Sequence, residues 1–199
     1  MKNNEPSLSE TYLKAFEYAF ILHRNQVRKG SQRPYISHLL AVSSMVMEHG
    51  GTETEAISAL LHDAVEDQGG LATLKIIRNE FGKEVAAIVE ACSDSVTSPK
   101  PPWRERKERY IKKLGTVSPS VILVSQADKL HNLRSLYADY LQKGDALWQY
   151  FRGGKDGTLW YYHKLVQVFQ TYGETPLLEE MKRVLGELVQ LVRSQEEQP

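Results

Sequence analysis

One short stretch of the chain, LLHDAVEDQGG, gathers side chains that bind metals or transfer protons. His62 and Asp63 come first, and Glu66 and Asp67 follow four residues later. Residues four apart share one face of a helix, so we expect His62 beside Glu66 and Asp63 beside Asp67. Such a cluster costs stability in a packed helix unless something compensates, and a divalent metal is the obvious candidate. The stretch therefore indicates metal-assisted chemistry.

Two imidazoles and two carboxylates along the chain are the candidate metal ligands: His38, His62, Asp63 and Asp128. This mixed nitrogen and oxygen set suits Mn, Fe, Zn, Co or Ni better than Mg or Ca, and it lacks the thiolates of structural zinc. An octahedral metal with four protein ligands keeps positions for water and a substrate oxygen. It can then acidify the water and polarise a phosphoryl group. Glu66 and Asp67 are candidates to accept the proton of that water.

Nearly every segment that must position these groups predicts a helix. The expected helices cover about 11–25, 36–48, 53–68, 70–92 with a break near Gly82, 103–114, 119–141, 159–172 and 176–194. Residues 121–124 are β-branched or apolar and could form a short strand, but the helical period of the residues that follow favours a helix. A Pro- and Ser-rich loop is expected over 95–103. We predict an all-α single domain over 1–199, with its core at about 8–172 and a C-terminal helix at about 176–194.

The composition is that of an ordinary globular protein, because 41% of its 199 residues are hydrophobic and 25% are charged. The formal net charge is zero, which argues against a nucleic-acid binder. Cys92 is the single cysteine, so no intramolecular disulfide forms and a reducing compartment is expected. No apolar leader and no run of about 20 apolar residues is present, so we expect a cytoplasmic protein without membrane contact. A homo-oligomer is compatible with the sequence.

Three motifs in this order carry a family resemblance: RKGSQRPYISH, ALLHDAVED and QADKLHNLRSL. They resemble the HD-domain (p)ppGpp hydrolases, which include the hydrolase half of the Rel/SpoT enzymes and the small alarmone hydrolases. The resemblance runs from about Ala15 to Tyr140. It implies the HD-domain helical bundle and a metal-dependent phosphohydrolase.

The resemblance also implies roles for single residues. The four candidate ligands match the family's metal ligands, and the metal there is usually Mn²⁺. Glu66 and Asp67 match the pair that orients and activates the attacking water. Four further positions match the substrate-binding region: Arg28 on the guanine face, Lys29 near the phosphates, Asn132 at the nucleoside, and Ser135, where the family often has Thr.

The implied partner is a guanine nucleotide with a 3′-pyrophosphate, guanosine 3′,5′-bis(diphosphate) or the pentaphosphate, which would give GDP or GTP and pyrophosphate. A loop with four basic residues, Arg24, Arg28, Lys29 and Arg33, suits a phosphate-rich ligand. The segment SDSVTSPKPPW differs from the sequence that is usual at this place in the family. The basic run at 100–109 is either a charged helix face or a lid that touches phosphate.

Two alternative functions remain open. One is an HD phosphohydrolase that acts on a nucleoside monophosphate, a dNTP or another 3′-phosphorylated nucleotide. The other is a module that senses the nucleotide without hydrolysing it. The presence of both Glu66 and Asp67 favours catalysis, since a sensing module has no need of them.

Overall fold

The computed structural model describes residues 8–95 and 99–196, so residues 96–98 of the expected Pro- and Ser-rich loop lie outside the described part. Within it, the regular elements are helices, which confirms the all-α prediction. They are α1 (Glu10–His23), α2 (Ile36–Glu48), α3 (Glu53–Leu61), α4 (Ala64–Asp67), α5 (Gly70–Cys92), α6 (Trp103–Leu114), α7 (Pro119–Lys143), the 3-10 helix η1 (Gly144–Tyr150), α8 (Gly154–Gln170) and α9 (Pro176–Glu196).

Local hydrogen bonds define where several helices begin. The Ser9 side chain accepts a hydrogen bond from the backbone of Thr11 and begins α1. Thr52 and Glu55 form a reciprocal capping box at the start of α3. Ser118 caps α7, with Pro119 in its first turn, so the run that could have formed a strand is helical.

The expected single helix through His62 and Asp63 is wrong. The helix ends at Leu61, and α4 begins only at Ala64. Asp63 lies between them with φ −96° and ψ −5°, a sparsely populated backbone region where active-site residues are often found. The amide of Asp67 still bonds the carbonyl of Asp63 at 3.0 Å, so the four-residue spacing survives the break. The break near Gly82 is as expected, since Gly82 has φ +93° inside α5.

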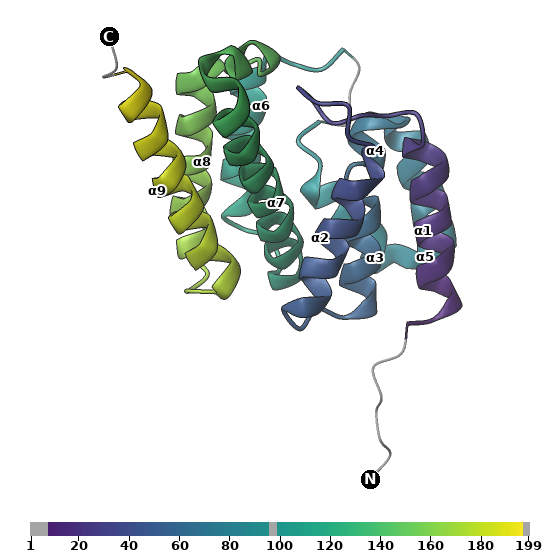
Figure 1. Cartoon of the computed structure of the whole chain (residues 1–199). Helices are drawn as coiled ribbons and strands as arrows, with labels where there is room; N and C mark the ends of the chain where they lie inside the picture. The colour runs from purple at the N-terminus through teal and green to yellow at the C-terminus, as the bar shows by residue number, and fades with distance from the viewer. Residues whose placement is uncertain (1–7, 96–98, 197–199) are drawn as a thin grey trace.

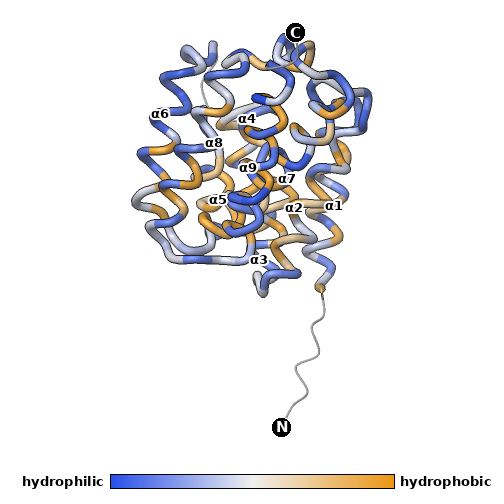
Figure 2. The backbone as a smooth tube through the Cα atoms, turned by 60° about the vertical axis from the view of Figure 1, so that its left-hand side comes forward, coloured by the Kyte–Doolittle hydropathy of each residue, from blue (hydrophilic) through white to orange (hydrophobic). Residues whose placement is uncertain are grey.

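The helices pack side by side around α7, which contacts α2, α3, α5 and α9 (Figure 1). One apolar core joins α7 to α6, α8 and α9, and a second joins α1 to α3 and α5. Along most helices the hydropathy alternates, as a helix with one buried face requires (Figure 2). In the part of the chain that is described, no helix has both the length and the apolar character to cross a membrane.

A tight contact fixes the start of α6 against α8. A Cβ added to Gly153 would lie 2.6 Å from the Trp103 indole, and one added to Gly157 would lie 3.1 Å from it. The two glycines therefore form a slot that the indole fills. This contact explains the Gly-rich turn FRGGKDG, whose last residues belong to α8. The contact also positions the basic run at 100–109, because α6 contains all of it except the first three residues.

We expect Gly153→Ala to lower the free energy of unfolding by about 1–3 kcal/mol, because the new methyl group collides with the ring of Trp103. Gly186→Ala is the matched control: it lies within α9, and an added Cβ meets no atom within 4 Å. That variant should be unchanged or stabilised by up to about 1 kcal/mol. Urea unfolding of both variants measures the difference. Equal stability of the two would contradict the slot.

Candidate functional site

Four side chains from three regions of the chain converge at one point. His38 comes from α2, His62 and Asp63 from the break between α3 and α4, and Asp128 from α7. The Asp128 Oδ1 atom lies 3.3 Å from the Nε2 atom of His38 and 3.5 Å from that of His62. Asp63 Oδ2 lies 3.0 Å from His62 Nε2 and 3.6 Å from His38 Nε2. The structure thus brings together all four predicted ligands.

Two of these donor atoms have no hydrogen-bond partner among the residues that the structure describes. The Nε2 atoms of His38 and His62 are buried and unpaired, although both face carboxylates. An unpaired buried polar atom is costly, so native proteins rarely leave one without a reason. Ligand atoms of His38, His62 and Asp128 all lie within 4.8 Å of one another. Two nitrogens and two carboxylate oxygens in this arrangement fit a divalent transition metal.

Each imidazole is oriented by its other nitrogen. His62 Nδ1 lies 2.7 Å from the carbonyl oxygen of Ala59, so it donates there and Nε2 is the nitrogen directed at the two carboxylates. His38 Nδ1 lies 2.8 Å from Nδ1 of His131, a residue of α7. Burial, with help from His38 and Arg28, lowers the pKa of His131 to about 3, so this ring is neutral and can accept. Partners of this kind fix the tautomer of metal-binding histidines.

The two carboxylates have partners too. The hydroxyl of Tyr35 donates to Asp63 Oδ2 at 2.6 Å. Lys129 Nζ lies 2.6 Å from Asp128 Oδ2, while the amide of Asn132 donates to Asp128 Oδ1 at 2.5 Å. Burial raises the pKa of Asp128, but Lys129 and the imidazole of His62 outweigh it and hold that pKa well below the usual value. Asp128 is therefore ionised at neutral pH.

Glu66 and Asp67 lie together at the end of α4. Lys100 Nζ lies 3.0 Å from Glu66 Oε1 and 3.4 Å from Asp67 Oδ1, and Gln26 donates to the other oxygen of Asp67 at 2.9 Å. Burial raises the pKa of Glu66, and the nearby carboxylates of Asp94 and Asp63 raise it further. A carboxylate with a raised pKa is a stronger proton acceptor, which suits a general base.

The predicted substrate-binding residues lie along one wall of a cavity of about 600 Å³. Arg28 donates to the side-chain oxygen of Asn132 at 2.7 Å, and its guanidinium lies 5.7 Å from the Tyr35 ring centre. Lys29 and Ser135 also line the cavity, Lys29 with an exposed side chain. The same cavity reaches Asp63, Glu66 and Asp128, so the predicted substrate-binding residues and the candidate metal site share one space.

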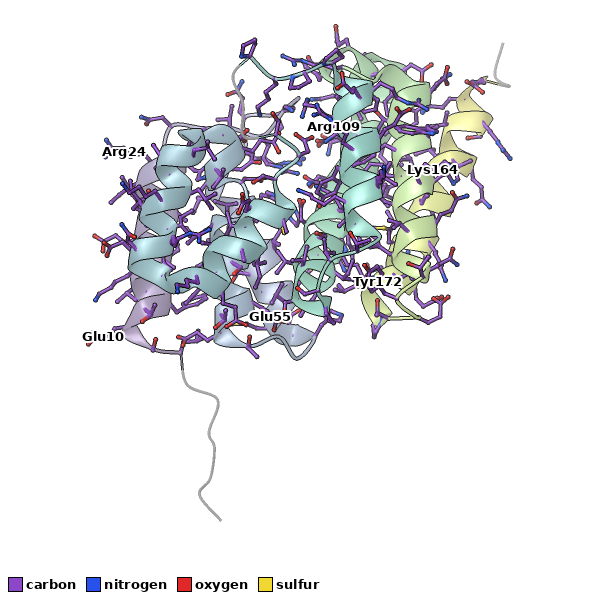
Figure 3. All side chains as sticks on the ribbon, turned by 180° about the vertical axis from the view of Figure 1, so that it is seen from behind. Glu10, Arg24, Glu55, Arg109, Lys164 and Tyr172 are labelled. Atoms are coloured by element: carbon purple, nitrogen blue, oxygen red, sulfur yellow. The ribbon has the colours of Figure 1, made fainter. Side chains whose placement is uncertain are left out.

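Another group of residues that line this cavity is basic and aromatic. It contains Lys100, Arg106 and Lys107 beside Trp103 and Tyr161. The basic run at 100–109 is therefore divided. Arg104 pairs with Glu108 and lies 3.3 Å from the Trp160 ring centre, outside the cavity lining. Figure 3 shows Arg109 on α6 and Lys164 on α8, with Tyr172 at the lower end of the molecule.

Several residues at the site were not expected from the sequence. Gln26, Tyr35 and Lys129 contact the predicted ligands or the Glu66–Asp67 pair. Asp94 pairs with Arg106 and Lys107. Lys129 is next to Asp128 in sequence, which was a usable signal. The roles of Gln26 and Asp94 at the site carried no local signal, because Asp67 lies 41 residues from Gln26 and Arg106 lies 12 residues from Asp94.

Comparisons with known proteins agree with this arrangement. The model of the HD domain family matches residues 15–159. The guanosine-3′,5′-bis(diphosphate) 3′-pyrophosphohydrolase MESH1 of Xenopus tropicalis is 39% identical over 127 residues, which are 62% of this chain and 68% of that protein. A probable GTP pyrophosphokinase of Mycobacterium leprae is 37% identical over 125 residues, 62% of this chain but only 15% of that protein.

Two solved structures resemble the fold. The structure of a metazoan ortholog of SpoT, described as hydrolysing ppGpp, has a TM-score of 0.74 and 26% sequence identity, covering 92% of this chain and 98% of that one. The structure of lmo0812 from Listeria monocytogenes has a TM-score of 0.67 and 30% identity, covering 79% of this chain and 99% of that one.

We expect Tyr35→Phe to weaken the affinity for Mn²⁺ by about 10- to 100-fold, because Asp63 loses the hydroxyl that orients it. Tyr172→Phe is the matched control, since its hydroxyl donates to the carbonyl of Leu114 instead. Calorimetric titration of metal-free protein measures both. If the two variants bind Mn²⁺ as tightly as the parent protein, Tyr35 does not support the site.

Proposed function

Because this chain belongs to the HD-domain (p)ppGpp hydrolase family, we propose that it removes the 3′-pyrophosphate of guanosine 3′,5′-bis(diphosphate). The products are GDP and pyrophosphate, or GTP and pyrophosphate from the pentaphosphate. The observation that carries the proposal is the pair of unpaired imidazole nitrogens facing two carboxylates inside a cavity lined by cations. A metal and a polyphosphate are the ligands that such a cavity complements.

The proposed metal ligands are His38, His62, Asp63 and Asp128, and the proposed metal is Mn²⁺. The donor set supports this choice, since two imidazoles and two carboxylates fit a borderline divalent ion. When bound, the metal supplies Lewis-acid polarisation of a phosphoryl oxygen and a lower pKa for water. Lys129 and Asn132 hold Asp128 in place, and Tyr35 holds Asp63.

Glu66 is the proposed general base, and Asp67 orients the water with it. The raised pKa of Glu66 and its position on the cavity wall support this role. The water adds to the phosphorus that carries the ribose 3′-oxygen, and Glu66 takes its proton. The bond between this phosphorus and the 3′-oxygen breaks, and the 3′-oxygen leaves with the electron pair and takes up one proton. The proton that the water loses is balanced by the proton that the 3′-oxygen gains, so the reaction consumes one water.

Arg28 and Asn132 would hold the nucleoside, with Lys29 and Ser135 beside them. A planar guanidinium stacks well on a purine, and the hydrogen bond to Asn132 already holds Arg28 at the cavity wall. The same Asn132 touches Asp128, so the nucleoside contact and the metal ligand are linked through one amide. This link would set the distance between the base and the reacting phosphorus.

Product analysis tests the proposed reaction. Purified protein with Mn²⁺ is incubated with guanosine 3′,5′-bis(diphosphate), and separately with GTP, dNTPs and AMP, and the products are separated by anion-exchange chromatography. We expect GDP and pyrophosphate from the first compound only, and no turnover in EDTA. Cleavage of another nucleotide instead would overturn the substrate while keeping the metal site. Tight binding with no product would favour a sensing module.

Two variants separate the metal ligands from the base. Asp63→Ala should lose metal binding and turnover together. Glu66→Gln should keep metal binding but lower kcat by about 10²- to 10⁴-fold, because an amide cannot accept the proton. Glu84→Gln, on the exposed part of α5, should behave like the parent protein. Full activity of Glu66→Gln would show that another group accepts the proton.

A further inference from the structure

Lys100 stands at a junction that the proposed roles leave unexplained. Its ammonium contacts both Glu66 and Asp67, and in the described residues no other lysine contacts either of them. The side chain is 32% exposed and lines the cavity. In this position Lys100 occupies one oxygen, Oε1, of the Glu66 carboxylate that must accept a proton from water. The contact is therefore one that the reaction has to weaken.

The backbone that follows Lys100 is held in place, although its side chain is long. Pro101 and Pro102 follow it and lead directly into α6. The Pro101 carbonyl accepts a hydrogen bond from Arg106 Nε at 3.2 Å, and Arg106 is buried. The slot of Gly153 and Gly157 holds Trp103, the first residue of α6. Only the flexible four-carbon stem of Lys100 is thus free to redirect its ammonium.

The two neighbouring cations have a different counter-ion. Arg106 and Lys107 both pair with Asp94, Lys107 at 2.7 Å. Burial raises the pKa of Asp94, but Lys107 and Arg106 outweigh it and hold that pKa well below the usual value. Asp94 therefore stays charged and keeps its two partners. Arg106 also lies 3.6 Å from Glu66, so the basic wall continues without a gap from Asp94 to the catalytic pair.

We propose that Lys100 is a phosphate-binding specificity residue. When substrate is present, Lys100 moves away from the Glu66–Asp67 pair and binds the terminal phosphate of the substrate's 3′-pyrophosphate. The inference rests on the proposed hydrolysis and extends it to the group that distinguishes a 3′-pyrophosphate from a 3′-monophosphate. The terminal phosphate lies beyond the attacked phosphorus, and Lys100 borders the cavity on the side of the water-activating pair.

The change of partner follows from electrostatics. A terminal phosphate offers more negative charge and more acceptor oxygens than a carboxylate, so it competes well for an ammonium. When Glu66 takes the proton from water, its charge is neutralised and its attraction for Lys100 falls. The departing pyrophosphate gains charge in the same step. Lys100 is then bound most strongly to the group that carries the developing charge, which favours the transition state.

The experiment compares two substrates and two ligands. Lys100→Gln removes the charge and keeps most of the side-chain length. We expect kcat/KM for guanosine 3′,5′-bis(diphosphate) to fall by about 10- to 100-fold, the effect of one charge-assisted hydrogen bond. For guanosine 5′-diphosphate 3′-monophosphate, which has no terminal phosphate to bind, kcat/KM should fall much less. In EDTA, where nothing is turned over, the Kd of the bis(diphosphate) should rise while that of GDP stays constant.

Two variants serve as controls. Lys112→Gln changes an exposed lysine of α6, the helix that follows Lys100, outside the cavity lining and should leave every value unchanged. Lys100→Arg keeps the charge and should restore most of the preference for the 3′-pyrophosphate. An equal loss on both substrates would overturn the proposal, because it would mean that Lys100 acts only on the carboxylate pair. No loss on either, with unchanged Kd values, would overturn it too.

Turnover by the parent protein in the same assay tests the proposed function separately. If the parent protein cleaves neither substrate, the hydrolase proposal fails. The Kd comparison in EDTA still decides whether Lys100 recognises the terminal phosphate, because it needs no reaction.

Discussion

The burial of two imidazole nitrogens without hydrogen-bond partners is the constraint on which the structure depends. His38 and His62 point these atoms at the carboxylates of Asp63 and Asp128, and the four side chains come from α2, the break between α3 and α4, and α7. Desolvating this set is expensive, so the surrounding cores must supply the free energy that holds it together. The residues next in sequence do so: Leu39 and Leu61 belong to one apolar core, and Ala127 and Leu130 to the other. A bound divalent metal would give these two nitrogen atoms the partner that they lack.

Hydrogen bonds from the loop between α1 and α2 connect the candidate metal site with the predicted substrate-binding residues. Gln26 bonds Asp67, Tyr35 bonds Asp63, and Arg28 reaches Asp128 through Asn132. The far end of this loop is tied to α7 by Arg33 with Asp139 and by Lys143 with the carbonyl of Gly30. A loop with so many attachments holds Arg28 in position before any ligand arrives. Pre-organisation of this kind lowers the entropic cost of binding.

The neutral chain concentrates positive charge where a polyphosphate would lie. The net charge of zero hides two basic walls of one cavity, one on the loop between α1 and α2 and one at Lys100 and the first turns of α6. Each cation is held by an acid: Arg106 and Lys107 by Asp94, Lys129 by Asp128, and Lys100 by the pair at the end of α4. Without these acids the walls would repel each other, and without the cations the acids would weaken the binding of an anion.

The sequence by itself determined the helices and the identity of the converging residues. Helical periodicity and capping residues are local, so the expected starts at about 53 and 119 agree with α3 and α7, which Thr52 with Glu55 and Ser118 cap. The motifs around His38, His62 and Asp128 indicated the family, and the four side chains do converge. The sequence did not predict the interruption of the helix at Asp63, because the backbone there accompanies contacts of the Asp63 carboxylate with His62 and Tyr35. Only the tertiary structure decided that Gln26 supports Asp67, that Trp103 fills a slot of two glycines, and that Lys100 reaches the Glu66–Asp67 pair. These contacts join residues far apart in the chain, and no local pattern records them, because they are set by how whole helices pack.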